Sequence, residues 1–142
     1  MIQIISGIQN TTAALQAEQT RLDVISENIA NANTAHGVDG KPYQRQVVVF
    51  ETALQQQMGA GGASQMPTLK VARIVNDNRA PVQIYDPGNP DADDQGMISM
   101  PNINIHEEMA DLISASRTFE ADLAVVKNSR SMAMETLAIG KH

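Results

Sequence analysis

The sequence of 142 residues contains no cysteine and no tryptophan. The missing thiol excludes disulfide bridges, thiolate metal ligands and cysteine nucleophiles. Two tyrosines and two phenylalanines make up the whole aromatic content of 3%, although large rings usually dominate the burial of a core. Ala, Ile, Val, Leu and Met supply most of the 42% that is hydrophobic. This composition favours helix seams over a thick, self-sufficient core.

Basic residues are also few. Ten Lys and Arg against sixteen Asp and Glu give a net charge of -6, which argues against a nucleic-acid-binding surface. No apolar run approaches the length of a membrane span. Residues 1–7 lack the basic region and apolar stretch of a cleavable signal peptide. We therefore expect a cytoplasmic protein, or one exported by a route that needs no such signal.

Signatures of catalysis are weak. The histidines His36, His106 and His142 lie in different segments, and His106 lacks the second histidine that a zinc-protease helix carries four residues later. Glycines 59, 61 and 62 fit no phosphate-binding pattern, and there is no Gly-x-Ser-x-Gly elbow. We predict no catalytic residue and no cofactor.

One acidic segment resembles a cation site. Residues 91–96, Asp-Ala-Asp-Asp-Gln-Gly, have oxygen side chains at the first, third and fifth positions and glycine at the sixth, as an EF-hand loop does. The twelfth position is Asn102 and not the bidentate Glu of that loop. A solvated acidic turn is the favoured interpretation, so we predict no metal site.

The first part of the chain, about residues 6–31, has the apolar periodicity of a helix. Ile8, Leu15, Leu22 and Ile29 recur every seven residues, and Ile25 adds a position three after Leu22. Residues 6–9 fit a capping box at its start. Residues 28–34 end it, because asparagine side chains compete for backbone hydrogen bonds.

The last part, about residues 105–139, predicts a longer helix. Asn104 is a favourable N-cap, Glu107 occupies the capping-box position, and Glu108 beside it suits the positive end of the helix. Gly140 provides a C-terminal stop. The apolar stripe alternates spacings of three and four over Met109, Leu112, Ser116, Phe119, Leu123, Val126, Arg130, Ala133 and Leu137.

The middle part is mixed. Residues 47–50, 69–75 and 82–85 have strand composition, and residues 76–78 are predicted to connect the last two as a hairpin. A flexible Gly-rich loop is expected at about 55–68, and residues 86–91 predict consecutive turns.

We therefore predict a mainly α fold with a small β insert, in which two long coiled-coil-like helices pair antiparallel. Residues 1–34 and 105–142 would form a core domain, with residues 35–104 inserted between them. Two helices alone enclose too little interior to cover both seams, so other chains should cover the rest. We expect this assembly interface to comprise Ile8, Leu15, Leu22, Ile25, Ile29, Met109, Leu112, Phe119, Leu123, Val126 and Leu137.

Charge is unevenly distributed between two neighbouring segments. Residues 86–108 carry six Asp or Glu and no Lys or Arg, and residues 36–81 carry five Lys or Arg against three Asp or Glu. Opposite charges of this kind suit head-to-tail contacts between copies, although chance is a serious alternative.

Residues 21–34, Arg-Leu-Asp-Val-Ile-Ser-Glu-Asn-Ile-Ala-Asn-Ala-Asn-Thr, resemble the N-terminal signature of flagellar rod and hook proteins. The hallmark is Leu-Asp followed by Asn-Ile-Ala-Asn-x-Asn-Thr. Further segments resemble the FlgC type of proximal rod protein, and Phe119 stands where that family often has tyrosine. These segments are residues 39–45, 48–51, 85–87, 90–93, 101–104, 108–121 and 137–141.

The resemblance implies a structural subunit without enzymatic activity. Such subunits pass through the flagellar type III export channel without a cleavable signal, and assemble in the periplasm with rod relatives into a tube between the membrane ring and the distal rod. Their terminal helices form its inner layer and are often disordered before assembly. A soluble coiled-coil adaptor or chaperone is the alternative from the residues alone, and an enzyme is a distant third.

Overall fold

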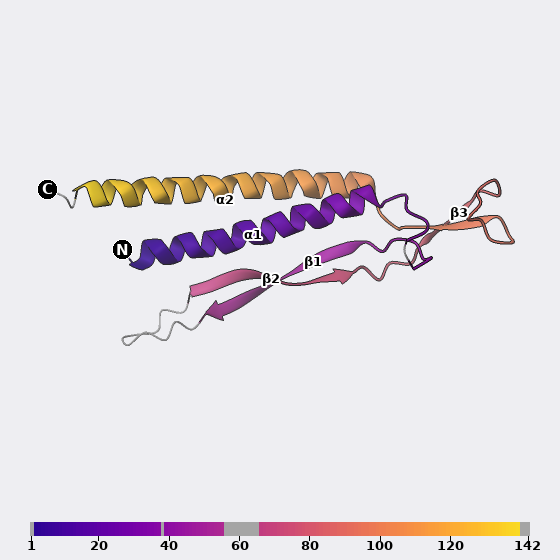
Figure 1. Ribbon diagram of the computed structural model, residues 1–142, viewed down its shortest axis with the longest axis horizontal. Coiled ribbons are helices and arrows are strands. Elements are labelled where there is room, and N and C mark those ends of the chain that lie inside the picture. Colours follow the sequence, from indigo (N-terminus) through magenta and orange to yellow (C-terminus); the bar gives the residue numbers. More distant parts are fainter. Residues whose placement is uncertain (1, 38, 56–65, 140–142) are drawn as a thin grey trace.

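The computed structural model (Figure 1) consists of two long antiparallel helices with two small antiparallel hairpins between them in the chain. It describes residues 2–37, 39–55 and 66–139, and the side chains of residues 10–37, 39–51 and 71–139. The helices are α1 (Ile2–Ala30) and α2 (Ile105–Ile139). The strands are β1 (Gln46–Gln55), β2 (Met66–Asn76), β3 (Val82–Tyr85) and β4 (Met97–Met100). The predicted mainly α fold with a small β insert is confirmed.

Helix α1 is the central element of the molecule. It packs against α2 on one side and against β1 and β2 on the other. The β3–β4 hairpin extends past the end of the helix pair, while both chain ends lie at the opposite end (Figure 1). Since α1 has partners on two sides and α2 packs along one, α2 keeps the larger uncovered surface.

The strands pair in two separate sheets. β1 pairs with β2 from Gln46↔Asn76 onward, with an irregularity between Val49 and Phe50, and β3 pairs with β4. The predicted hairpin joining residues 69–75 to 82–85 is therefore wrong. Asn76 instead belongs to the first ladder, and the N–H of Asp77 extends it by donating to the carbonyl of Arg45 at 2.7 Å. The sequence pattern predicted no strand at β4, which is the strand that pairs with β3.

The helix ends follow the predictions in part. The side chain of Asn104 accepts from the N–H of His106 at 3.1 Å, and its amide donates to Glu107 at 3.1 Å, so Asn104 is the N-cap of α2. Asn31 ends α1, with its side-chain amide donating to the carbonyl of Glu27 at 2.9 Å. The capping box at residues 6–9 is wrong, because α1 already begins at Ile2. Gly140 and most of the Gly-rich loop, residues 56–65, lie outside the described residues.

Small and medium side chains form the buried core. Ala17, Val24 and Ile25 of α1 and Ala115 of α2 are buried together with Ala32 and Ile98. Ala115 is completely buried, which fits a close approach of the two helices at that point. In the described part of the chain, neither helix combines the length and the apolar character needed to cross a membrane.

Candidate functional site

The covered side of α2 is a seam of mostly small or polar side chains. Glu108 and Ala115 are buried, and partly covered side chains follow at spacings of three and four. Four members of the predicted stripe lie on this seam. The seam comprises Glu108, Leu112, Ala115, Phe119, Asp122, Val126, Ser129 and Ala133.

The remaining large residues of the predicted stripe lie beside the seam and are uncovered. Met109 is 50% exposed, Leu123 37% and Leu137 53%. Arg130 is exposed and Ser116 is partly covered. Other large apolar residues of α2 are exposed as well, and these are Ile105, Ile113, Val125, Met132, Met134 and Ile139. A helix surface of this kind offers apolar area that the chain itself does not cover.

Helix α1 contributes less uncovered apolar surface. Ile25 is buried, and Leu15, Leu22 and Ile29 are partly covered. The side chain of Ile8 lies outside the described residues. The described positions of α1 that are exposed are polar or small, namely Thr12, Gln16, Gln19, Asp23, Ser26, Glu27 and Ala30.

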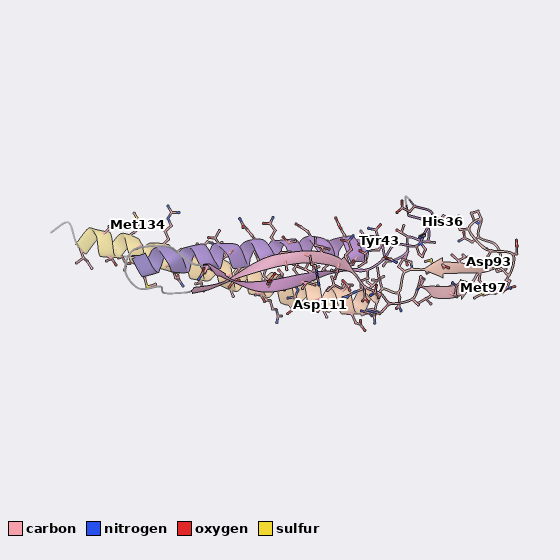
Figure 2. All side chains as sticks on the ribbon, turned by 90° about the horizontal axis from the view of Figure 1, so that it is seen from below. His36, Tyr43, Asp93, Met97, Asp111 and Met134 are labelled. Carbon is pink, nitrogen blue, oxygen red and sulfur yellow. The ribbon has the colours of Figure 1, made fainter. Side chains whose placement is uncertain are left out.

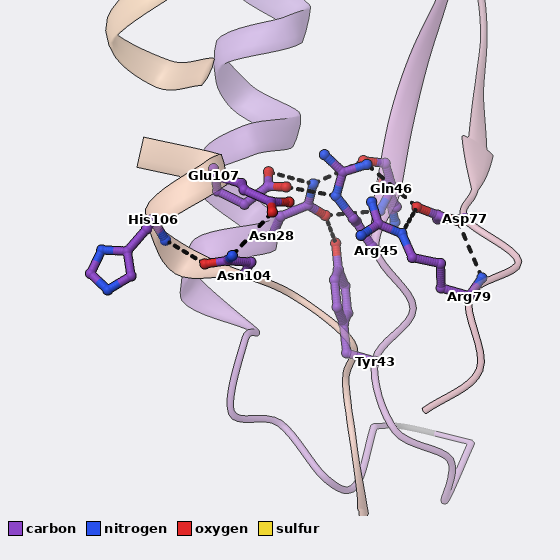
Figure 3. A network of polar contacts seen from close by, with 10 residues as sticks. Asn28, Tyr43, Arg45, Gln46, Asp77, Arg79, Asn104, His106 and Glu107 are labelled. Carbon is purple, nitrogen blue, oxygen red and sulfur yellow. Dashed lines mark hydrogen bonds and ion pairs between the residues drawn. The ribbon is translucent and has the colours of Figure 1, made fainter. Parts of the chain in front are cut away.

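A polar junction joins the end of α1, the start of β1 and the start of α2 (Figure 3). We use this name for Asn28, Tyr43, Arg45, Gln46 and Glu108. The Asn28 amide group donates to the carbonyl of Gln46 at 2.8 Å and to Glu108 at 3.1 Å. Its oxygen accepts from the N–H of Gln46 at 2.8 Å and from the Tyr43 hydroxyl at 3.1 Å. Asn28 is 1% exposed and uses its full hydrogen-bonding capacity.

An ion pair completes the junction. The carboxylate of Glu108 accepts from Nε of Arg45 at 2.6 Å. Nη1 of Arg45 lies 3.5 Å from Asp77, whose carboxylate also accepts from Nε of Arg79 at 2.8 Å. Glu108, expected only to favour the helix's positive end, is therefore a buried partner of Arg45. A buried carboxylate needs such pairing.

Proton affinities are altered at Tyr43 in the junction and at Asp77 beside it. Burial, and secondarily the carboxylates of Glu27 and Glu108, raise the pKa of Tyr43 above its ordinary value. The hydrogen bond from the Arg79 side chain holds the pKa of Asp77 below its ordinary value. Both shifts favour the protonation states that the observed hydrogen bonds require.

The oppositely charged segments 36–81 and 86–108 contact each other within one chain. Besides the Arg45–Glu108 pair, Nδ1 of His36 lies 3.5 Å from the carboxylate of Asp91. Asp93, at the same end of the molecule (Figure 2), accepts from the N–H groups of Gln95 and Met97 at 2.8 and 2.9 Å. Within the described ranges, no three His, Asp or Glu side chains are grouped as ligands for one ion. His106 is exposed, and His142 lies outside the described residues.

A groove of about 250 Å³ lies beside the junction, between α1, β1 and the first turns of α2. Apolar side chains lining it include Val24, Ile25, Val48 and Phe50, and Asp111 of α2 contributes a carboxylate. Sequence reasoning found neither this groove nor the junction, because periodicity marks apolar faces and gives no signal for a buried Asn or Glu.

The sequence matches two family models of flagellar rod proteins. Residues 8–35 match "Flagella basal body rod protein", and residues 94–139 match "Flagellar basal body rod FlgEFG protein C-terminal". These ranges contain most of α1 and all of α2, so the uncovered surface of α2 lies within a matched segment.

Relatives named "Flagellar basal-body rod protein FlgC" are similar over nearly the whole chain. The protein of Yersinia enterocolitica is 38% identical, covering 91% of this chain and 92% of the relative. That of Borreliella burgdorferi is 38% identical over 96% and 97%. That of Bacillus subtilis is 36% identical over 92% and 94%. On this similarity, the chain belongs to the FlgC family of flagellar basal-body rod proteins and is a structural rod subunit.

Proposed function

We propose that this chain is a subunit of the proximal rod, which joins copies of itself and other rod proteins through its terminal helices. The product is a tube around the export channel, connected at its base to proteins of the membrane ring and export gate. The subunit reaches the periplasm without a cleavable signal peptide. Residues 1–34 and 105–142 form the core domain of this tube, and residues 35–104 form the insert.

The uncovered apolar surface of α2 carries this proposal. Large apolar side chains with exposures from 37% to 78% extend along α2 from Ile105 to Ile139. Fully covering one such side chain contributes roughly 1.5–3 kcal/mol relative to leaving it exposed. A subunit that buries them against its neighbours gains this free energy on assembly.

Basal bodies purified from cells that produce the chain test the proposal. We expect the chain in the purified rod. We expect Met134→Glu to abolish its incorporation, because Met134 is 62% exposed and the substitution would place a charge on the apolar surface that assembly buries. Asn128→Glu is the matched control, because it introduces the same charge at an exposed polar position of the same helix. Absence of the parent chain from basal bodies would refute the proposal.

Circular dichroism tests whether folding is coupled to assembly. The helices contain 29 and 35 residues, or 64 of 142. We expect an isolated monomer to show fewer helical residues, because isolated helical segments without packing are marginal in water. All 64 helical residues in a dilute, verified monomer would contradict this coupling.

A further inference from the structure

The groove beside the polar junction has apolar side chains on its walls and one carboxylate without an ion pair. Its lining also includes Arg21, which lies 3.7 Å from Glu18, and Arg45, which is paired with Glu108, so both of these positive charges already have partners. Val24 and Ile25 of α1 and Val48 and Phe50 of β1 supply apolar lining. Asp111 on α2 is partly exposed and makes no hydrogen bond or ion pair with any residue that the structure describes. The groove therefore suits an aliphatic side chain accompanied by a cationic group.

A ridge of matching chemistry lies on the distal half of the same helix. Leu123, Lys127, Arg130 and Met134 are spaced by four, three and four residues, so they lie on one side of α2. All four are exposed, and neither Lys127 nor Arg130 forms an ion pair within the described part of the chain. Apolar anchors at both ends of the ridge thus flank two unpaired positive charges.

The ridge cannot reach the groove of its own chain. Lys127 follows Asp111 by sixteen residues on a continuous helix, which at about 1.5 Å per residue is a separation of about 24 Å. The two surfaces can meet only between different molecules.

We propose that the groove receives the Leu123–Met134 ridge of a second copy of this chain, with Lys127 facing Asp111. The proposal rests on the rod function above and names one contact within that assembly. An amphipathic helix lying in an apolar groove is a common mode of recognition. Two copies in the same orientation, displaced by about 24 Å along the helices, bring the two residues level.

This contact is heterologous, because each copy offers its groove to one neighbour and its ridge to another. Such contacts propagate as an open helical array or close into a ring. A second copy is the preferred occupant because one chain carries both complementary surfaces, which lie a fixed distance apart on one rigid helix.

Cross-linking in assembled rods tests the contact directly. The chain has no cysteine, so a variant carrying Asp111→Cys and Lys127→Cys has thiols at these two positions alone. A short thiol-reactive cross-linker applied to purified basal bodies should give dimers and longer ladders of this chain. Each single variant should give no such species, because the contact joins unlike surfaces. Pairing Asp111→Cys with Asn128→Cys, turned by about 100° from position 127, is the matched control and should give much less product.

Charge reversal provides an independent readout. Asp111→Lys should lower the amount of chain incorporated, and adding Lys127→Asp should restore it. Adding Arg117→Asp, which reverses another exposed base of α2 without an ion pair, should give no rescue.

The outcomes separate this contact from the proposed function. Incorporated double-cysteine chains that form no ladder, cross-link only to a different rod protein, or cross-link as single variants overturn the second-copy contact and leave the rod function standing. Failure of the parent chain to incorporate overturns the rod function itself.

Discussion

Replacing Asn28 by alanine should strongly destabilise the junction end of the molecule. The Asn28 side chain makes four hydrogen bonds, two of them to the backbone of Gln46. The substitution leaves the N–H and carbonyl of Gln46 and the carboxylate of Glu108 short of a partner. With roughly 1 kcal/mol net for each bond, and more where a buried group stays unsatisfied, we expect a loss of about 3–5 kcal/mol.

This loss is large compared with the stability of an ordinary domain, about 5–15 kcal/mol. With a urea dependence of about 1–3 kcal/mol per molar, the unfolding midpoint should fall by about 1 M or more. The junction contains its own reporter, because Tyr43 donates to Asn28 and the chain has no tryptophan. A Tyr85→Phe background leaves Tyr43 as the sole tyrosine, so its fluorescence follows the junction alone.

Asn33→Ala is the control, because Asn33 is exposed in the loop after α1 and exposed substitutions usually change stability by about 0.5 kcal/mol or less. Equal midpoints for the two alanine variants would refute the reasoning. A parent chain whose Tyr43 signal shows no cooperative transition would refute it too, since the junction would then not form in the isolated chain.

Three further predictions concern packing, proton binding and a turn. Ala115→Leu should cost about 1–3 kcal/mol by overpacking the helix seam, whereas Ala121→Leu at an exposed position should be nearly neutral, as urea unfolding will measure. The folded-state pKa of Tyr43 is raised. Its contribution to stability is therefore present below the unfolded pKa of about 10 and is lost as pH rises through the folded pKa. Tyr43→Phe should flatten this alkaline decline in the free energy of unfolding. Gly96→Ala should lower hydrogen-exchange protection of β3 and β4, because Gly96 has φ +73° and a Cβ there would lie 3.1 Å from Pro87 and Tyr85, whereas at Gly88 the nearest atom is 3.6 Å away.

The regular elements could be predicted from sequence because their signals are local. Helix α2 begins after Asn104 as expected, since a capping side chain acts within one turn. Helix α1 begins earlier than predicted, because Ser6 and Gln9 imitate a capping box inside a segment that is already helical. Strand pairing is not local. Residues 82–85 were assigned the wrong partner because strand composition shows that a segment is extended and does not show which edge it meets.

The polar junction could not be predicted for a different reason. Asn28 and Glu108 each have an ordinary local explanation, as a helix terminator and as a charge near a helix's positive end. Their burial depends on Arg45 and Tyr43, which reach them only after the chain has returned alongside α1. Removing one partner of a buried ion pair typically costs several kcal/mol. The junction thus specifies how the three elements meet. A different placement of α2 would separate Glu108 from Arg45 and lose this free energy.

The covered seam of α2 does not coincide with the predicted apolar stripe, and this difference relates the fold to assembly. The predicted stripe alternates between two columns of α2 positions, and the fold covers the column that contains Leu112, Phe119 and Val126. The other column on the covered side contains Glu108, Ala115, Asp122 and Ser129, none of which is a large apolar residue. Glu108 explains this choice, because its bonds to Arg45 and Asn28 turn that column toward α1. The rotation leaves Met109, Leu123 and Leu137 uncovered. A helix placed by a buried polar contact can therefore present its larger apolar side chains to a neighbouring subunit. A helix placed by apolar burial alone would have covered those side chains within its own chain.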